Sequence, residues 1–169
     1  TDRDEEGKPV CEACGAGSHG AVGAAAALPC EAGSYSSATN LTAAGECTAC
    51  PAGSACSTGS IEPTPCSPGT SAAKERQPKC EPCPPGTSSK AGSDACDQCE
   101  AGRYAANTGQ GLCVPCPHPL SSVNGSTTCS LCMDDYYLRD PPSVDILTSP
   151  TEFCKPCPPD AVCPDNTTL

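Results

Sequence analysis

Closely spaced pairs of cysteines are the residues of this chain that offer the most chemistry. The stretch CEPCPPGTSSKAGSDACDQC, residues 80–99, holds two Cys-x-x-Cys pairs with twelve residues between them. Four such thiolates can bind zinc, a single pair can act as a redox dithiol, and all four can join a disulfide-stapled repeat. The choice among these three chemistries decides which functions are open to the chain.

The composition shows how much the cysteines must contribute to folding. Leu, Ile, Val and Phe together make up about a tenth of the 169 residues, Trp is absent, and there are 20 Pro and 16 Gly. A chain this poor in large apolar side chains cannot build an ordinary packed core. The 18 cysteines are the remaining source of stability, as in disulfide-dense secreted domains. The net charge of −11 argues against nucleic acid or an anionic membrane surface as a partner.

The cysteines mark a repeat of about 16 residues. Each unit starts at a Cys followed three residues later by Gly or a substitute, and another Cys usually stands three residues before the start. The Pro and Gly suit a type I turn with Gly at its fourth position. Many units have a second Gly before the closing Cys, at Gly45, Gly92, Gly109 and Gly125, and Asn124-Gly125 is a hairpin signal. We therefore expect turn, short strand, turn, short strand in each unit. The repeat starts are Cys14, Cys30, Cys50, Cys66, Cys83, Cys99, Cys116, Cys132 and Cys157.

Zinc and redox chemistry fit this repeat less well than disulfides. The spacing between pairs is shorter than in zinc ribbons, and neither His19 nor His118 stands at a ligand-like spacing from a partner. Ala27 and Pro63 replace a Cys in two units, and losing one ligand would open a tetrahedral site. A thioredoxin-like pair needs a helix start in an α/β fold, a pattern found around none of the pairs. We expect disulfides, with no metal and no cofactor.

Local spacing predicts the pairing. Joining each repeat start to the first Cys of the next doublet closes loops of about fourteen residues, each contributing ~3 kcal/mol in the chain-entropy model. Cys11 and Cys14 are left over, and they bond each other or bridge to another segment or chain. The predicted pairs are Cys30–Cys47, Cys66–Cys80, Cys83–Cys96, Cys99–Cys113, Cys116–Cys129 and Cys132–Cys154, with short loops at Cys50–Cys56 and Cys157–Cys163.

Three Asn-x-Ser/Thr sequences predict covalent N-glycans, at Asn40, Asn124 and Asn166. They favour a secreted chain. The acidic start DRDEE, residues 2–6, loosely resembles a calcium-binding prelude, but a solvated terminus is the simpler interpretation. No Ser-His-Asp or Cys-His arrangement is present, so we expect no enzyme activity.

Tandem C-x-x-C-P-x-G-[ST]-x-S units, clearest at residues 80–88 and 113–121, resemble the cysteine-rich repeats of ephrin-receptor-like and GCC2/GCC3 type. These repeats are relatives of the tumour-necrosis-factor-receptor and EGF-like modules. Residues 50–71 look most like the GCC2/GCC3 form, and the resemblance covers roughly residues 11–163. It implies an elongated, non-catalytic extracellular array. The match is interrupted at residues 21–28, at CPHPL, and by an insertion at residues 133–153.

The expected fold is therefore small and disulfide-rich: an elongated tandem array of short β-hairpin repeats with little helix and no large hydrophobic core. We divide the chain into an acidic mobile terminus (1–10), atypical repeats (11–47), regular repeats (47–132), a repeat with a long insertion (132–154) and a partial repeat (154–169). Tyr35, Tyr104 and Tyr137 fall five residues after a repeat start, where a ring could cover the neighbouring disulfide.

Two functions fit this architecture. The first is a rigid spacer and assembly unit of a cell-surface or filamentous glycoprotein, contacting other protein chains. The second is a receptor-type module that captures a ligand. The insertion concentrates apolar residues, so Tyr136, Leu138 and Ile146 are predicted to contact a partner. The alternative is that the insertion's apolar residues pack together as a satellite core under a long loop.

Overall fold

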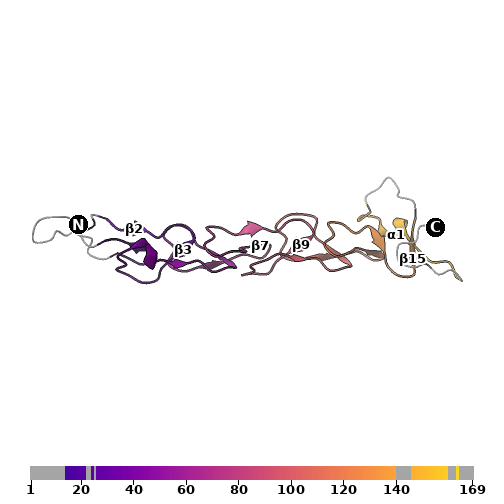
Figure 1. Cartoon of the computed structure of the whole chain (residues 1–169). Coiled ribbons are helices and arrows are strands. Elements are labelled where there is room, and N and C mark those ends of the chain that lie inside the picture. The colour runs from indigo at the N-terminus through magenta and orange to yellow at the C-terminus, as the bar shows by residue number, and fades with distance from the viewer. Residues whose placement is uncertain (1–13, 22–23, 25, 140–145, 160–162, 164–169) are drawn as a thin grey trace, which may run out of the picture. The chain divides into compact units, whose positions relative to one another are not determined.

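The computed structural model describes residues 14–21, 24, 26–139, 146–159 and 163, and almost all of its regular structure consists of short β-hairpins (Figure 1). Each strand is two or three residues long and pairs antiparallel with one partner, without closing a barrel. The hairpins are β1 with β2, β3 with β4, β5 with β6, β7 with β8, β9 with β10, β11 with β12, β13 with β14, and β15 with β16. This confirms the predicted fold class of a small, disulfide-rich chain with almost no helix.

The elements have the following bounds. The strands are β1 Ser18–His19, β2 Leu28–Pro29, β3 Ser34–Tyr35, β4 Thr48–Ala49, β5 Ser54–Ala55, β6 Thr64–Pro65, β7 Thr70–Ser71, β8 Glu81–Pro82, β9 Thr87–Ser88, β10 Asp97–Gln98, β11 Arg103–Tyr104, β12 Val114–Pro115, β13 Leu120–Ser121, β14 Leu131–Cys132, β15 Tyr136–Leu138 and β16 Cys154–Pro156. The helical turns are η1 Ala44–Glu46 and α1 Pro150–Phe153.

The turn after each repeat start differs by one residue from the sequence expectation. In the repeat that starts at Cys83, the Thr87 amide donates to the Pro84 carbonyl, so Gly86 is the third residue of the turn and has φ of 80°. A positive φ at the third position belongs to a type II turn, not to the type I turn that the Pro and Gly predicted. The Thr87 hydroxyl also donates to the Pro84 carbonyl, at 2.7 Å. This second bond explains why Ser or Thr so often follows the turn glycine.

Two repeats form a turn at this place without glycine. Asp135 stands in the glycine position of the repeat that starts at Cys132, with φ of 68°, and its carbonyl accepts from the Cys157 amide at 2.8 Å. In the preceding repeat Pro119 takes this position after a cis peptide bond, and the Leu120 amide donates to the Pro117 carbonyl. The start of the insertion thus keeps the positive φ of the turn at Asp135, whereas CPHPL forms its turn with a cis proline, as in a type VI turn.

Backbone hydrogen bonds tie each repeat to the next. In the pair of repeats that start at Cys83 and Cys99, the Gly86 amide donates to the Ala105 carbonyl, and the Gly109 amide donates to the Cys83 carbonyl, both at 2.8 Å. Equivalent bonds recur elsewhere in both halves of the chain. The donor in the second kind of bond has a positive φ in every case, and these donors are Asn40, Gly59, Arg76, Gly92, Gly109 and Gly125.

The position six residues after a repeat start is buried in several repeats and holds a small side chain there. Ala72 and Ala105 are 0 % exposed, and Ser89 and Ser122 are 2 % exposed. The repeat that starts at Cys132 is an exception, with Leu138 at this position. Cys56 fills the same position in the repeat that starts at Cys50 and forms a disulfide with that cysteine. We call this the small-residue position.

Cystines form most of the core. The structure joins eight pairs within its described residues, and they are the pairs that local spacing predicts: Cys30–Cys47, Cys50–Cys56, Cys66–Cys80, Cys83–Cys96, Cys99–Cys113, Cys116–Cys129, Cys132–Cys154 and Cys157–Cys163. Cys14 is buried, whereas Cys11 lies outside the described residues. Few large apolar side chains are buried with the cystines, Leu120 and Phe153 being the main ones.

The chain divides into two compact units. The first contains residues 1–81 and 91–95, and the second contains residues 82–90 and 96–169. Within the first unit, η1 directly precedes Cys47 in the loop that the Cys30–Cys47 disulfide closes. The Glu46 carboxylate accepts from the Thr42 and Ala43 amides at 2.6 and 3.0 Å. The sequence suggested that Gly45 is the equivalent of Gly92 and Gly109. This was wrong, because Gly45 lies in the turn η1. In the part of the chain that the structure describes, no helix is long and apolar enough to cross a membrane.

Candidate contact surface of the second unit

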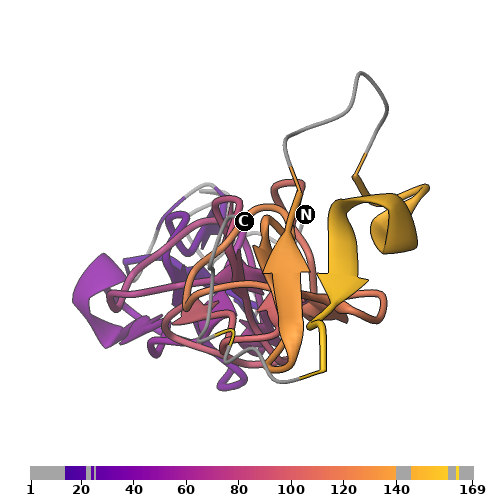
Figure 2. The same cartoon turned by 90° about the vertical axis from the view of Figure 1, so that its right-hand side faces the viewer.

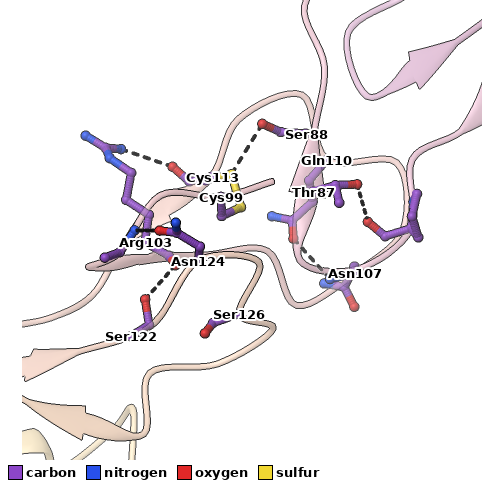
Figure 3. The surroundings of a disulfide bond; sticks show 12 residues. Thr87, Ser88, Cys99, Arg103, Asn107, Gln110, Cys113, Ser122, Asn124 and Ser126 are labelled. Carbon is purple, nitrogen blue, oxygen red and sulfur yellow. Dashed lines mark hydrogen bonds between the residues drawn. A yellow bond between two sulfur atoms is a disulfide. The ribbon is translucent and has the colours of Figure 1, made fainter. Parts of the chain in front are cut away.

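The repeat around the Cys99–Cys113 disulfide is held by bonds from both neighbouring repeats (Figure 3). The Cys99 carbonyl accepts from the Gly125 amide at 2.7 Å, and the Cys99 amide donates to the Gly86 carbonyl at 2.9 Å. The Ser88 Oγ lies 3.3 Å from the Cys113 Sγ. Because a disulfide sulfur carries no hydrogen, the Ser88 hydroxyl is the donor in this contact.

Side chains add bonds within this repeat and between it and the next one. The Arg103 guanidinium donates to the Cys113 carbonyl at 3.1 Å, and the Ser122 hydroxyl donates to the Arg103 carbonyl at 2.7 Å (Figure 3). The Ala101 amide donates to the Asn124 Oδ1 at 2.8 Å, across 23 residues of sequence. The two repeats thus present one continuous, preorganised surface, which lowers the entropy cost of binding.

This surface contains an open groove of about 860 Å³. Its wall is mixed in character, because the half-buried Met133 and the 61 % exposed Val123 lie beside serine hydroxyls and the exposed Asp134 carboxylate. The volume falls within the range of about 300–1,000 Å³ that is common for small-ligand sites. The lining residues are Ala101, Ser121, Ser122, Val123, Asn124, Leu131, Cys132, Met133 and Asp134.

The described residues carry few of the signs of a catalytic or metal centre. Among them, no group of three His, Cys, Asp or Glu side chains is arranged to bind a metal ion. Elsewhere among these residues, the amides of Thr42 and Ala43 lower the pKa of the Glu46 carboxyl from its ordinary value of 4.5. Glu46 lies in the turn η1 of the first unit and accepts from the amides just before that turn, so its lowered pKa follows from local structure.

The residues predicted to contact a partner lie beside the groove but are not freely exposed. Tyr136, Leu138 and Ile146 are partly buried and pack against a cluster that includes Leu120 and the Cys132–Cys154 disulfide. The Tyr136 ring also meets the His118 ring edge-on, with the ring centroids 5.3 Å apart. Figure 2 shows the two strands of this region, β15 and β16, side by side, with α1 leading into β16. These side chains therefore pack as the satellite core that the sequence left open as the alternative. Their contact with a partner stays a prediction.

The predicted glycosylation sites fall in different surroundings. Asn40 is exposed, with φ of 61°, and its amide donates to the Cys14 carbonyl at 2.8 Å. Asn124 is also exposed, but its side chain is held by the Ala101 amide at the groove wall. Asn166 lies outside the described residues.

Sequence reasoning missed the groove itself. The groove combines Ala101 with residues 121–124 and 131–134, which hydrogen bonds between repeats bring together. The available signal was the recurrence of Ala, Ser or Cys six residues after seven of the nine repeat starts, at a position that is buried in the regular repeats.

Comparison with known proteins agrees with this repeat architecture. Residues 86–124 match the family described as tyrosine-protein kinase ephrin type A/B receptor-like. The match covers about a quarter of the chain and includes the Cys99–Cys113 disulfide of Figure 3. No curated protein matches the chain significantly. Residues 86–124 are therefore similar to an ephrin-receptor-like cysteine-rich repeat, and that family is a receptor-like module and not a catalytic one.

Proposed function

We propose that this chain is a non-catalytic, extracellular assembly segment of a cell-surface or filamentous glycoprotein. It serves as a disulfide-stapled spacer whose surface contacts other protein chains. Its disulfides require an oxidising compartment, which is the main support for an extracellular location. The likeness to the ephrin-receptor-like repeat supports a role in protein interaction.

The main support for the spacer role is that the disulfide-bonded repeats also form backbone hydrogen bonds with their neighbouring repeats. Within the second unit, for example, the Cys83, Gly86 and Cys99 backbone groups all bond to a neighbouring repeat. A chain whose repeats fix one another loses little conformational entropy on assembly. Such a segment suits a load-bearing or distance-setting role, because its local geometry does not depend on a bound ligand.

Cross-linking of native surface material tests this function. Exposed lysines such as Lys74, Lys79 and Lys90 are suitable amine targets. We expect reproducible cross-links from this chain to other structural chains of the same surface assembly, together with filaments or a continuous coat in particle images. A monomeric parent protein that binds a soluble protein ligand tightly and never assembles would contradict the proposal.

A receptor-type module is the second candidate, and the groove in the second unit is the observation that favours it. Its wall offers both apolar and polar groups on a preorganised surface, as ligand sites do. Val123→Glu would place a charge on the exposed part of this wall while leaving the disulfides intact. Loss of ligand capture with normal assembly would favour the receptor function, whereas unchanged capture would count against it.

A further inference from the structure

The groove in the second unit contains a glycan acceptor in its own wall. Asn124, Gly125 and Ser126 form an Asn-x-Ser sequence, and Asn124 lines the groove. We propose that Asn124 carries an N-glycan and that the innermost sugars of this glycan occupy the groove. The inference rests on the proposed extracellular location, because the modification takes place in the secretory pathway.

The Asn124 side chain is held in a way that is compatible with this modification. Its Oδ1 accepts a hydrogen bond from the Ala101 amide at 2.8 Å, which leaves the Nδ2 as the remaining polar atom of the amide. In the transfer, the Nδ2 loses a proton and forms a bond to C1 of the first sugar, while the bond from C1 to a lipid-linked diphosphate breaks and the diphosphate leaves. In the folded glycoprotein the Oδ1 can still accept from the Ala101 amide, because the new bond is made at the Nδ2. The attached sugar therefore starts from a fixed point on the groove wall.

The lining of the groove matches the surface of an amino sugar. Val123 is 61 % exposed, and with Met133 it offers apolar surface to the C–H face of a sugar ring and to an acetyl methyl group. The Ser121 hydroxyl and the Asp134 carboxylate lie in the same wall and can bond to sugar hydroxyls. A volume of about 860 Å³ gives room for a disaccharide-sized group.

A glycan in this groove would also cover Val123, an exposed apolar side chain of its wall. Because the covering group would be covalently anchored to the same wall, its effective concentration would be high and weak sugar contacts would suffice. Assembly contacts of the proposed function would then use other faces of the repeats.

Met133 provides a direct readout, because it is the only methionine in the chain and lines the groove. Dilute hydrogen peroxide transfers one oxygen to its thioether and leaves water, and intact mass follows the reaction. We would secrete the whole chain from eukaryotic cells, map glycan occupancy by peptide mass, and compare Met133 oxidation rates before and after enzymatic deglycosylation under native conditions. We expect removal of the Asn124 glycan to speed Met133 oxidation at least threefold.

Three variants separate the glycan from the protein's own structure. Ser126→Ala abolishes the acceptor sequence but keeps Asn124 and its bond to Ala101, so Met133 should oxidise at the fast rate in this variant. Ser126→Thr keeps an acceptor sequence and should restore the slow rate of Met133 oxidation. Asn40→Gln removes the other predicted acceptor within the described residues and should leave Met133 unaffected. Enzymatic removal covers the case in which Ser126→Ala fails to fold.

Two results would overturn the inference. One is an Asn124 without glycan in material where Asn40 is modified, which would leave the extracellular proposal standing. The other is a glycan on Asn124 with the same Met133 oxidation rate in its presence and absence. If neither Asn124 nor Asn40 is modified in secreted material, both the inference and the glycoprotein part of the proposed function fail.

Discussion

Arg76 lies in a backbone conformation that side chains other than glycine seldom adopt. Its φ is 62°, its amide donates to the Cys50 carbonyl, and the equivalent residues of four other repeats are glycine. A left-handed conformation costs a residue with a Cβ about 1 kcal/mol or more. We expect Arg76→Gly to raise the free energy of unfolding by about 1 kcal/mol in guanidinium titrations of the oxidised protein.

The matched control for this change is Arg76→Ala. It removes the exposed guanidinium but keeps the Cβ and therefore the strain, so the unfolding midpoint should stay close to that of the natural chain. A gain in stability from the alanine variant as large as that from the glycine variant would show that the side chain, and not the backbone, is responsible.

Glu46 gives the first unit a local dependence on pH. The Thr42 and Ala43 amides donate to its carboxylate and lower its pKa below 4.5. A lowered pKa in the folded state means that the capped turn is favoured above the unfolded-state pKa and is lost as the pH falls through the folded-state pKa. In an NMR titration, the Thr42 amide shift should therefore move with a midpoint below pH 4.5. Glu46→Gln should abolish this step, and a midpoint at or above the ordinary value would contradict the cap.

At the scale of the hairpin, the small-residue position decides whether neighbouring repeats fit together. Ala105 is 0 % exposed, its carbonyl accepts from the Gly86 amide, and its amide donates to the Ser126 carbonyl. Ala105→Leu should cost about 1–3 kcal/mol, because overpacking forces these backbones apart. Ala105→Ser should be tolerated, since Ser122 fills the equivalent position one repeat later. Thermal unfolding of both variants checks this. Equal losses of stability in the two variants would show that side-chain size at this position is not what limits the fit of the repeats.

The turn glycine allows a second close approach, between repeats two apart. A Cβ built on Gly86 would collide with the Gly125 carbonyl, and φ at Gly86 is 80°. We expect Gly86→Ala to destabilise the second unit by at least about 2 kcal/mol. Gly45→Ala is the control, because a Cβ there meets no atom within 4 Å. Hydrogen exchange at the Gly125 amide should rise in the first variant and stay unchanged in the second.

The hairpins and their staples could be predicted from the sequence, because both follow from the even spacing of cysteines and from local turn residues. The contacts between repeats could not. Arg76 takes a left-handed backbone without any mark in the sequence, while its amide bonds to the neighbouring repeat. The groove was missed for the same reason: its walls come from segments that are distant in the sequence. The composition of the apolar insertion leaves both a contact surface and a satellite core open, because it does not reveal that its side chains pack against Leu120 and a cystine.

For the whole molecule, the disulfides should determine whether the chain folds at all. Four consecutive bridges close loops with sequence separations of 13 or 14 residues, and each such loop contributes ~3 kcal/mol in the chain-entropy model. Reduction should therefore remove the protected amides of both units, as read by hydrogen exchange. Alkylation of the denatured, unreduced chain should label few thiols, and after reduction it should label 18. Eight or more reactive thiols before reduction, or stoichiometric zinc, would contradict this picture.

The spacing of these bridges also fixes how the chain responds to tension. Between Cys66 and Cys129, each bridge ends two residues before the next begins, and those residues are the strands β8, β10 and β12. A strand is already extended at about 3.3 Å per residue, and each bridge spans only 5.6–5.8 Å between Cα atoms. A pulling force would pass through the sulfurs and leave the loops unloaded, so the segment should behave as an inextensible tether. Each reduced bond would then release a loop able to extend by roughly 45 Å, which makes tether length a function of the surrounding redox potential.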